Sequence, residues 1–481
     1  MFSFTPLLDN TINKPIYYQL YEYIKKEIIN GNIKGNTKLP SLRKLSDHLH
    51  LSKNTIESAY QQLYAEGYIE SIPKSGYRVV DINSSLCKLA QSFSSEVVEP
   101  EELNDSKKYK YDLAPRYTDK ACFNLAAWKR ISNSVMNEEF ESLLSYGDPQ
   151  GEYDLREEIA KYIYEHRGVH CHPKQIIVGA GTQYCLSLLC QMLRSTHHSM
   201  YMEDPGSNWI RFIFERHEFH IEPIAVHNNG LNISQLEENK SNIVFVTPSH
   251  QFPKGVVMSA SNRLQLLNWA QNNKGIIIED DYDSEMRFSG RPIPSLKSLD
   301  KNDSVIFLGS FSKIFLPSIR IGYMVLPQWL LKLYLEKYRM YEQTASRLNQ
   351  KALARFMKEG YWQSHIRKVR RHYQNKYNTI TKAINAYMKD KVNLISSSAG
   401  LRVILEIKTS LTEGDMVDIA KNAGINISPV SQYYMLPNTY KEDGKIKVML
   451  SYKGIPIEDI EPAVKALNDA WFESFPSSQN L

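Results

Sequence analysis

A lysine, an acid and a tyrosine follow two apolar runs in this chain. The run 276–278 leads to Asp280 and Tyr282, and the run 305–308 leads into the sequence GSFSK, which ends at Lys313. Apolar runs of this kind predict buried β-strands. A lysine amine can link covalently to an aldehyde, an acid can keep a ring nitrogen protonated, and a hydroxyl can contact a ring oxygen. This set of groups is typical of a site for pyridoxal phosphate (PLP).

A second group of residues has the composition of a phosphate site. Gly181 follows the apolar run 176–178, and Thr182 and Gln183 lead into the apolar helix that comes next. Backbone N–H groups and the helix dipole make such a helix N-terminus a site for anions. Three further side chains near Lys313 could complete a phosphate cup: Ser310, Ser312 and Arg320. Each piece alone is common in α/β proteins, but their order, with each piece at a strand end, points to PLP.

The elements that must position these residues alternate along the chain from about residue 111 to 475. Apolar runs predict strands at 176–178, 199–202, 243–246, 276–278 and 305–308, and amphipathic helices separate them. Strands that alternate with helices form a mainly parallel sheet flanked by helices. The predicted fold class is therefore α/β, in a unit that spans residues 111–481.

The first 80 residues follow a different pattern. Helical spacing of apolar residues predicts helices at 16–29, 41–48 and 53–66, and a β-hairpin follows between residues 68 and 80. Three helices and a hairpin form a winged helix-turn-helix. Residues 81–110 are rich in Ser, Glu and Lys and have little periodicity, so we expect a linker between unit 1–80 and unit 111–481.

The head resembles the GntR-type winged helix in the order and spacing of residues 35–45 and 51–56. In such a module the third helix enters the DNA major groove with its N-terminal end toward the bases. The resemblance implies that double-stranded DNA is the partner. The implied contacts are Arg43 and Lys44 in the second helix, Ser52, Lys53, Asn54 and Thr55 at the start of the third, and Lys74, Ser75 and Gly76 at the hairpin tip. The alternative is a small protein-interaction domain with solvated polar residues.

The whole chain resembles a MocR/GabR-type regulator, in which a GntR-type head is fused to a fold-type I aminotransferase-like domain with a small C-terminal α+β subdomain. Besides the motifs above, the resemblance is carried by residues 145–151, 247–253 and 278–285. It implies a homodimer, because Tyr146 stands where aminotransferases reach into the partner subunit's site.

The same resemblance implies a role for each residue of the PLP site. Lys313 would form the aldimine with PLP, Asp280 would pair with the pyridine nitrogen, and Tyr282 would contact the ring oxygen. The residues implied to hold the phosphate are Gly181, Thr182, Gln183, Ser310, Ser312 and Arg320. Tyr146 would contribute from the other subunit.

The chain departs from active aminotransferases at several positions. Phe252 stands where these enzymes carry an asparagine that bonds to the cofactor, and Ser207 stands where an aromatic that covers the ring is common. The stretch 448–455 contains no arginine for a substrate carboxylate, and Lys453 is the substitute within it. Trp209 stands where the GABA-responsive member of the family uses an arginine. These departures favour a sensor over an enzyme and argue against GABA as its ligand.

The predicted function is a PLP-dependent, DNA-binding transcriptional regulator that senses a ligand through Lys313. The ligand would be PLP itself, or an amine or amino acid such as a D-alanine-type compound. One alternative is an active aminotransferase with a DNA-binding head. Another is a DNA-binding scaffold whose large domain only dimerises.

The composition of the chain is that of a globular protein, and its sequence patterns lead us to expect a cytoplasmic location. Hydrophobic residues make up 42% of the chain and charged residues 23%, which are ordinary values for folded domains. The sequence has neither the pattern of a signal peptide nor an apolar run long enough to span a bilayer. The 5 cysteines form no C-x-x-C pair, so neither a disulfide framework nor a metal site is expected.

Overall fold

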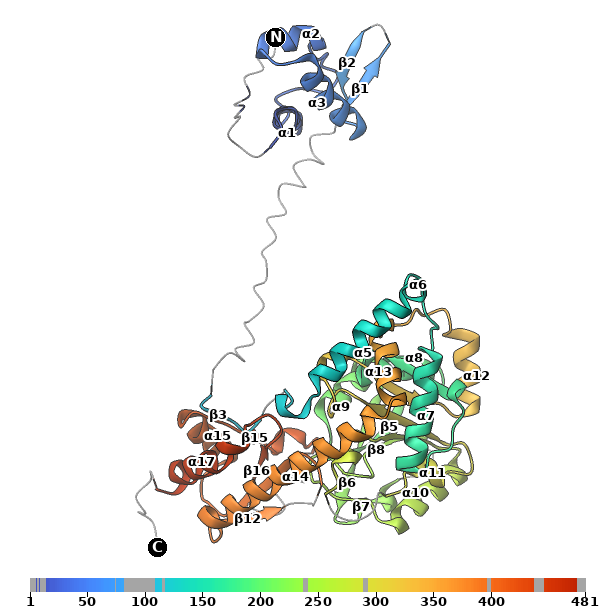
Figure 1. The fold of residues 1–481 in the computed structure, drawn as a ribbon, viewed down its shortest axis with the longest axis vertical. Coiled ribbons are helices and arrows are strands. Elements are labelled where there is room, and N and C mark those ends of the chain that lie inside the picture. Colours follow the sequence, from blue (N-terminus) through green and yellow to red (C-terminus); the bar gives the residue numbers. More distant parts are fainter. Residues whose placement is uncertain are drawn as a thin grey trace. The chain divides into compact units, whose positions relative to one another are not determined.

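The computed structural model divides the chain into two compact units, residues 1–107 and residues 108–481 (Figure 1). It describes Pro6, Leu8 and residues 14–73, 75–81, 109–114, 117–236, 241–288, 293–395, 399–436 and 445–473. Lys74 of the predicted hairpin tip and residues 82–108 of the predicted linker lie outside the described residues. Each unit has its own hydrophobic core, and each is described by itself.

The N-terminal unit is the winged helix-turn-helix that the sequence predicts. Its elements are α1 (Ile16–Ile29), α2 (Leu42–Leu49), α3 (Lys53–Ala65), β1 (Ile69–Ile72) and β2 (Gly76–Val79). The two strands pair antiparallel, with Ile69 opposite Val79. Leu20, Ile56 and Tyr60 are fully buried between the helices. The apolar stripes of the three helices therefore meet in one small core beside the hairpin.

The larger unit is built on an eight-stranded sheet in the order β4-β11-β10-β9-β8-β5-β6-β7. The strands are β4 (Ile176–Gly179), β5 (Ser199–Asp204), β6 (His220–His227), β7 (Gly230–Leu231), β8 (Ile243–Val246), β9 (Ile276–Asp280), β10 (Val305–Ser310) and β11 (Gly322–Val325). Strands β10, β9, β8, β5 and β6 are parallel, whereas β11 runs antiparallel to both of its neighbours. The five predicted strands are confirmed, and the sequence missed β6, β7 and β11.

Helices cover both faces of this sheet. Helices α8 (Thr182–Arg194), α9 (Asn208–Arg216) and α12 (Gln328–Lys337) pack with Ile278 and Ile306 on one face, and α10 (Ala260–Asn273) packs with Ile277 and Val305 on the other. Because consecutive strand residues are buried on opposite faces, the strands are continuous apolar runs in the sequence. No helix in the described ranges has both the length and the apolar composition needed to cross a bilayer.

Five further helices complete the large unit. They are α5 (Leu125–Glu138), α6 (Phe140–Leu143), α7 (Tyr153–Arg167), α11 (Leu296–Leu299) and α13 (Arg347–Lys358). Buried side chains of α5, α7 and α13 belong to one core with Ile176 of β4 and Val325 of β11.

A C-terminal subdomain follows the long helix α14 (Tyr361–Met388), as Figure 1 shows. It has an antiparallel sheet in the order β12-β13-β16-β15, formed by β12 (Val392–Ile395), β13 (Arg402–Ile407), β15 (Ser428–Pro429) and β16 (Ile446–Ser451). Helices α15 (Glu413–Asn422) and α17 (Ile457–Asn468) pack with it. The short strand β3 (Tyr111–Asp112) pairs in parallel with β14 (Ile425–Asn426). The first described segment of the large unit is therefore attached to this subdomain.

Candidate functional site

The predicted PLP residues lie where several strands end at the same edge of the large sheet. Asp280 is the last residue of β9 and pairs in register with Leu308 near the end of β10. Gly179 ends β4, which runs in the same direction as β10 because β11 lies antiparallel between them. Ligands of open α/β sheets bind outside the carboxyl ends of the strands. The fold therefore brings the separate sequence motifs to one place.

Three consecutive acids at the end of β9 have three different environments. Glu279 accepts hydrogen bonds from the backbone N–H groups of Leu296 and Lys297, both at 2.8 Å, and so holds the start of α11. Asp281 forms a two-pronged ion pair with Arg167, at 2.9 and 3.0 Å. Asp280 is 5% exposed, and its carboxyl group makes no hydrogen bond or ion pair with any described residue. Of the three, Asp280 is the carboxylate left available to a ligand.

The environment of Asp280 favours pairing of its carboxyl group with a cation that can share a proton. Burial, together with the negative charges of Asp281, Asp283 and Glu279, raises its pKa to about 7, against the opposing effect of Lys313. A buried carboxylate in this condition gains from any cation that pairs with it. A protonated ring nitrogen would be such a cation.

Lys313 lies beside the ring of Tyr282, with its Nζ 3.8 Å from the ring centroid. Burial and the positive charge of Arg402 lower the pKa of this lysine to about 8, while Asp283 and Asp280 oppose the shift. A lower pKa increases the fraction of neutral amine, which is the form that attacks an aldehyde. The environment of Lys313 is thus the one that a covalent cofactor link requires.

The hydroxyl of Tyr282 is held by His250, a histidine that residue patterns alone did not single out. The Tyr282 oxygen lies 3.2 Å from Nδ1 of His250, and the same nitrogen lies 3.0 Å from Asp283. His250 comes from the loop after β8, within the stretch 247–253 that carries part of the family resemblance. The predicted contact of Tyr282 with a cofactor ring oxygen stays a prediction.

The first residues predicted to hold the phosphate lie at the N-terminus of α8. Its N-cap is Gly181, so the helix has no side-chain cap for its first backbone N–H groups. Arg320 lies against this turn, because its Nη2 donates to the oxygen of Ala180 at 3.2 Å and a Cβ on Gly181 would stand 2.6 Å from the same nitrogen. Gly322 packs as closely, since a Cβ there would stand 2.7 Å from the backbone nitrogen of Thr182. At this turn the backbone, and not a capping side chain, would face a phosphate.

The two serines predicted to hold the phosphate lie at the end of β10 and just after it. The Ser312 hydroxyl is buried and has no hydrogen-bond partner among the described residues. A buried hydroxyl without a partner is costly unless a ligand supplies one. Ser310 accepts a hydrogen bond from the Ser312 backbone N–H at 3.3 Å. The side chain of Gln183 is exposed, so its backbone N–H is the group at the helix end.

These residues fit PLP as a group. The amine of Lys313, the unpaired carboxylate of Asp280 and the uncapped turn at Gly181 match the aldehyde, ring nitrogen and phosphate of the cofactor. The unpartnered Ser312 hydroxyl and the Arg320 guanidinium add the donors that a phosphate needs.

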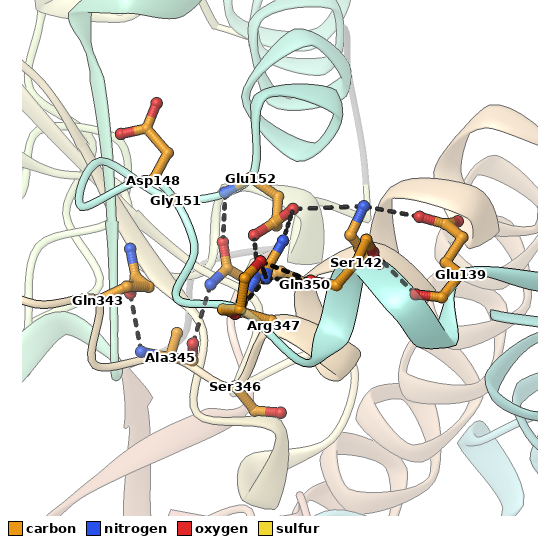
Figure 2. A network of polar contacts seen from close by, with 12 residues as sticks. Glu139, Ser142, Asp148, Gly151, Glu152, Gln343, Ala345, Ser346, Arg347 and Gln350 are labelled. Atoms are coloured by element: carbon orange, nitrogen blue, oxygen red, sulfur yellow. Dashed lines mark hydrogen bonds and ion pairs between the residues drawn. The ribbon is translucent and has the colours of Figure 1, made fainter. Parts of the chain in front are cut away.

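Tyr146 lies apart from this cluster within one chain. It stands on the loop between α6 and α7, and 87% of its side chain is exposed. Figure 2 shows the polar network that holds this loop, in which Arg347 pairs with Glu152 at 2.6 Å and Gln350 accepts from the Glu152 backbone N–H at 2.8 Å. Arg347 also donates to two backbone oxygens of the residues that precede Tyr146. The backbone of the loop is fixed while the tyrosine ring faces solvent.

The segment that begins at Gln343 connects this loop to the phosphate cup. Gln343 donates to the backbone oxygens of Pro149 and Val178, both at 3.1 Å. The next residue, Thr344, accepts from the backbone N–H of Ala180, also at 3.1 Å. The turn that would hold the phosphate and the exposed loop therefore share one support.

Two of the positions at which the chain departs from aminotransferases, Phe252 and Lys453, lie near a further arginine, Arg402. Phe252 lies under the guanidinium of Arg402, at 4.9 Å from the ring centroid. Burial and the charge of Arg402 lower the pKa of Lys453 to about 8. Ser207 is buried at the start of α9, and Trp209 is 45% exposed. The sequence analysis missed Arg402 because the family resemblance places a carboxylate-binding arginine within residues 448–455. The signal that could have identified it is a charged residue at the start of an apolar strand.

In the N-terminal unit, the residues predicted to contact DNA fall into two groups. Arg43, Lys44, Lys53 and Asn54 have exposed side chains on α2 and at the start of α3. Ser52 instead caps α3 by accepting from the Thr55 backbone N–H at 3.1 Å, and its hydroxyl lies 2.8 Å from the Thr55 hydroxyl. Ser75 and Gly76 lie at the turn that leads into β2, where Gly76 has a φ of +93°.

The fold and the site define a class of protein: a winged helix-turn-helix joined to a domain of the aminotransferase fold. Residues 16–79 match the family of bacterial regulatory proteins of the gntR type, and residues 116–466 match the family of class I and II aminotransferases. Among solved structures, an archaeal alanine:glyoxylate aminotransferase superposes with a TM-score of 0.69 at 25% identity, covering 76% of this chain and 91% of that one.

Relatives match this chain over nearly its whole length, across both parts. The HTH-type transcriptional regulator YdeL of Bacillus subtilis is 39% identical over 97% of this chain and 99% of its own length. The probable rhizopine catabolism regulatory protein MocR of Rhizobium meliloti is 31% identical over 97% and 95% of the two chains. This chain therefore belongs to the MocR-type transcriptional regulators, in which a GntR-type head is fused to a class I and II aminotransferase domain.

Proposed function

We propose that this regulator binds PLP at Lys313 and changes its affinity for operator DNA when an amino compound displaces Lys313 from the cofactor. The observation that carries the proposal is the unpaired, buried carboxylate of Asp280 at the same sheet edge as the low-pKa amine of Lys313. A structural acid would have a partner inside the protein, as Glu279 and Asp281 do. We place the protein in the cytoplasm, where its DNA is.

When bound, PLP supplies an aldehyde carbon that can exchange one amine for another. Lys313 would bind that carbon, and Asp280 would hold a proton on the ring nitrogen. The backbone N–H groups of Thr182 and Gln183, with Ser312 and Arg320, would hold the phosphate. An effector amine would compete with Lys313 for that carbon, and the Lys313 amine would be free whenever the effector is bound. Turnover is not required for such a signal.

Backbone hydrogen bonds link the C-terminal subdomain to the segment that follows the predicted linker, residues 81–110. Leu113 accepts a hydrogen bond from the Ser451 backbone N–H at 2.6 Å and donates to the oxygen of Asn426 at 2.9 Å. Ser451 in turn stands opposite Arg402 in the sheet. A shift of the C-terminal subdomain would therefore move the segment that leads back to residues 81–110. A switch of this kind needs a free-energy difference of only ~1–3 kcal/mol between its two states.

We further propose a homodimer that uses the loop of Tyr146. Leu144 and Tyr146 are 73% and 87% exposed on a loop that the Glu152–Arg347 pair holds in place. Two exposed apolar side chains on a fixed loop suit a contact with a second copy. Tyr146 of one subunit would then reach the PLP site of the other.

The test joins a spectral titration to a DNA-binding measurement. The purified PLP form is titrated with D-alanine, L-alanine and further PLP, and binding to the DNA upstream of its own gene is followed by fluorescence anisotropy. The proposal expects a visible absorption band from the covalent cofactor. It also expects at least one of these compounds to shift DNA affinity. Absence of the band, or catalytic formation of keto acid with DNA affinity unchanged, would contradict it.

The DNA contacts give a prediction of their own. Replacing Arg43 or Lys53 by alanine should weaken DNA binding and reduce the slope of log affinity against log salt by ~0.9 for each phosphate that is no longer neutralised. Lys26, exposed on α1 and outside the predicted DNA surface, is the matched control and should leave the slope unchanged. The measurement is a salt series of anisotropy titrations. A slope equal to that of the wild type in Arg43→Ala would remove this residue from the interface.

A further inference from the structure

Arg402 is a charged residue at the candidate site that has no polar partner among the described residues. Its guanidinium lies on the face of Phe252, 4.9 Å from the ring centroid. In the described part of the chain it makes no ion pair and no hydrogen bond, whereas the buried Arg167 and Arg263 are fully engaged by carboxylate, carbonyl and hydroxyl oxygens. A stacked guanidinium keeps its N–H edge available, because the ring contacts only its flat face.

The backbone around Arg402 is packed against the residues that surround Lys313. Gly400, two residues earlier, has a φ of +82°, and a Cβ there would collide with the imidazole ring of His250. His250 is the histidine that holds the Tyr282 hydroxyl, and the Tyr282 ring lies 3.8 Å from the amine of Lys313. The start of β13 therefore lies at the edge of the PLP site.

Lys313, Arg402 and Lys453 lie close enough for their charges to interact, and fewer carboxylates than cations are available to pair with them. The charges of Arg402 and Lys453 both lower the pKa of Lys313, and Arg402 also lowers that of Lys453. Asp280 is suited to the cofactor ring, and Asp283 pairs with His250. An additional anion would relieve the repulsion among these cations.

We propose that Arg402 binds the carboxylate of an amino-acid effector whose amino group displaces Lys313. This inference rests on the proposed function. The guanidinium offers two parallel N–H groups that match a carboxylate, and Phe252 below it fixes their plane. Phe252, which replaces a cofactor-binding asparagine, thus acquires a role as the support of Arg402. The effector is an amino acid, because a simple amine would leave Arg402 unpaired.

Paired ligands that differ only in the carboxylate test this proposal. The PLP form is titrated with glycine, D-alanine, L-alanine and 4-aminobutanoate, and with methylamine, ethylamine and propylamine, which lack the carboxylate. Binding is read from the visible spectrum and from calorimetry. In the wild type at least one amino acid should bind more tightly than its matched amine by ~30-fold, the effect expected of a charge-assisted, two-pronged contact.

The variants are Arg402→Gln and Arg402→Lys, together with Lys453→Gln, which tests the lysine that the sequence offered as the carboxylate ligand. Arg402→Gln should reduce the preference for the carboxylate to within about threefold, and Arg402→Lys should retain part of it because the charge remains without the fork. Lys453→Gln should keep most of the preference. Retention of the cofactor band in Arg402→Gln shows that the variant folds and loads.

The measurements distinguish failure of the proposed function from failure of the proposed role of Arg402. If the wild type shows no cofactor band, the proposed function itself is wrong. If the band is present but no amino acid exceeds its matched amine, or Arg402→Gln keeps the preference, only the role of Arg402 is overturned. A third result, in which Arg402→Gln changes the cofactor spectrum without changing the preference, would assign Arg402 to the cofactor ring oxygen and also overturn the proposal.

Discussion

Replacing Lys313 by alanine should abolish the covalent attachment of PLP to this protein. The Lys313 amine lies 3.8 Å from the Tyr282 ring centroid, and its pKa is lowered to about 8, so it is both placed and partly neutral at physiological pH. Alanine removes the nucleophile, and the visible absorption band of the bound cofactor should be lost completely. Borohydride reduction followed by peptide mass spectrometry should find the cofactor on the Lys313 peptide of the wild type and on no peptide of the variant.

The matched control is Lys453→Ala. Lys453 also has a pKa of about 8, so it would be equally reactive if a low pKa alone determined attachment. The proposal expects Lys453→Ala to keep the band and Lys313→Ala to lose it. Lys313→Ala should also make operator affinity independent of added amino acids, because nothing remains for an amine to displace. Attachment that persists in Lys313→Ala would show that another lysine is the cofactor residue.

The large sheet could be predicted from the sequence where its strands are buried on both faces. Such strands, as at 243–246 and 276–278, are continuous apolar runs that stand out between helices. β6 was missed because its sequence HIEPIAVH contains a proline, and its longest apolar run is only three residues. β11 was missed because only four residues pair, directly after the loop at Arg320, and its antiparallel insertion depends on two neighbours far away in the chain.

The sequence could predict those residues of the candidate site that come directly after a strand. The sequence placed an acid at the end of β9, but the contacts of Glu279 and Asp281 are what leave Asp280 unpaired. Those contacts come from α11 and α7, whose positions no local pattern gives. His250 and Arg402 were missed for the same reason, since each reaches the site only through tertiary packing.

The N-terminal unit shows a different limit of sequence interpretation. The helices and hairpin follow from apolar spacing, and the Ser41 side chain caps α2. Ser52 was interpreted as a DNA contact, yet its hydroxyl caps α3 and lies 2.8 Å from that of Thr55. A serine before a helix is favoured as a cap whether or not the helix reads DNA, so residue type alone does not separate the two roles.

The rate at which PLP attaches to the cofactor-free protein should rise with pH and level off near pH 8. Burial first, and then the charge of Arg402, lower the pKa of Lys313 from 10.5 to about 8, with Lys453 acting in the same direction and Asp283 and Asp280 opposing it. Only the neutral amine attacks the aldehyde. Below the pKa the neutral fraction grows tenfold per pH unit, and above it the fraction is constant. At pH 7 the shift increases the neutral fraction on the order of 100-fold over an ordinary lysine.

Stopped-flow absorbance across a pH series would measure this profile. Arg402→Gln provides the variant, because removing one cation should move the midpoint upward, toward the value of an ordinary lysine. The direction is fixed by charge: a neighbouring cation disfavours the protonated amine, so its loss raises the pKa. Lys453→Gln should move the midpoint in the same direction by less, since Lys453 has the smaller effect on Lys313. A rate that continues to climb beyond about pH 9 in the wild type would mean that Lys313 titrates as an exposed lysine does. The electrostatic account of the site would then be wrong, even with the cofactor bound where we propose.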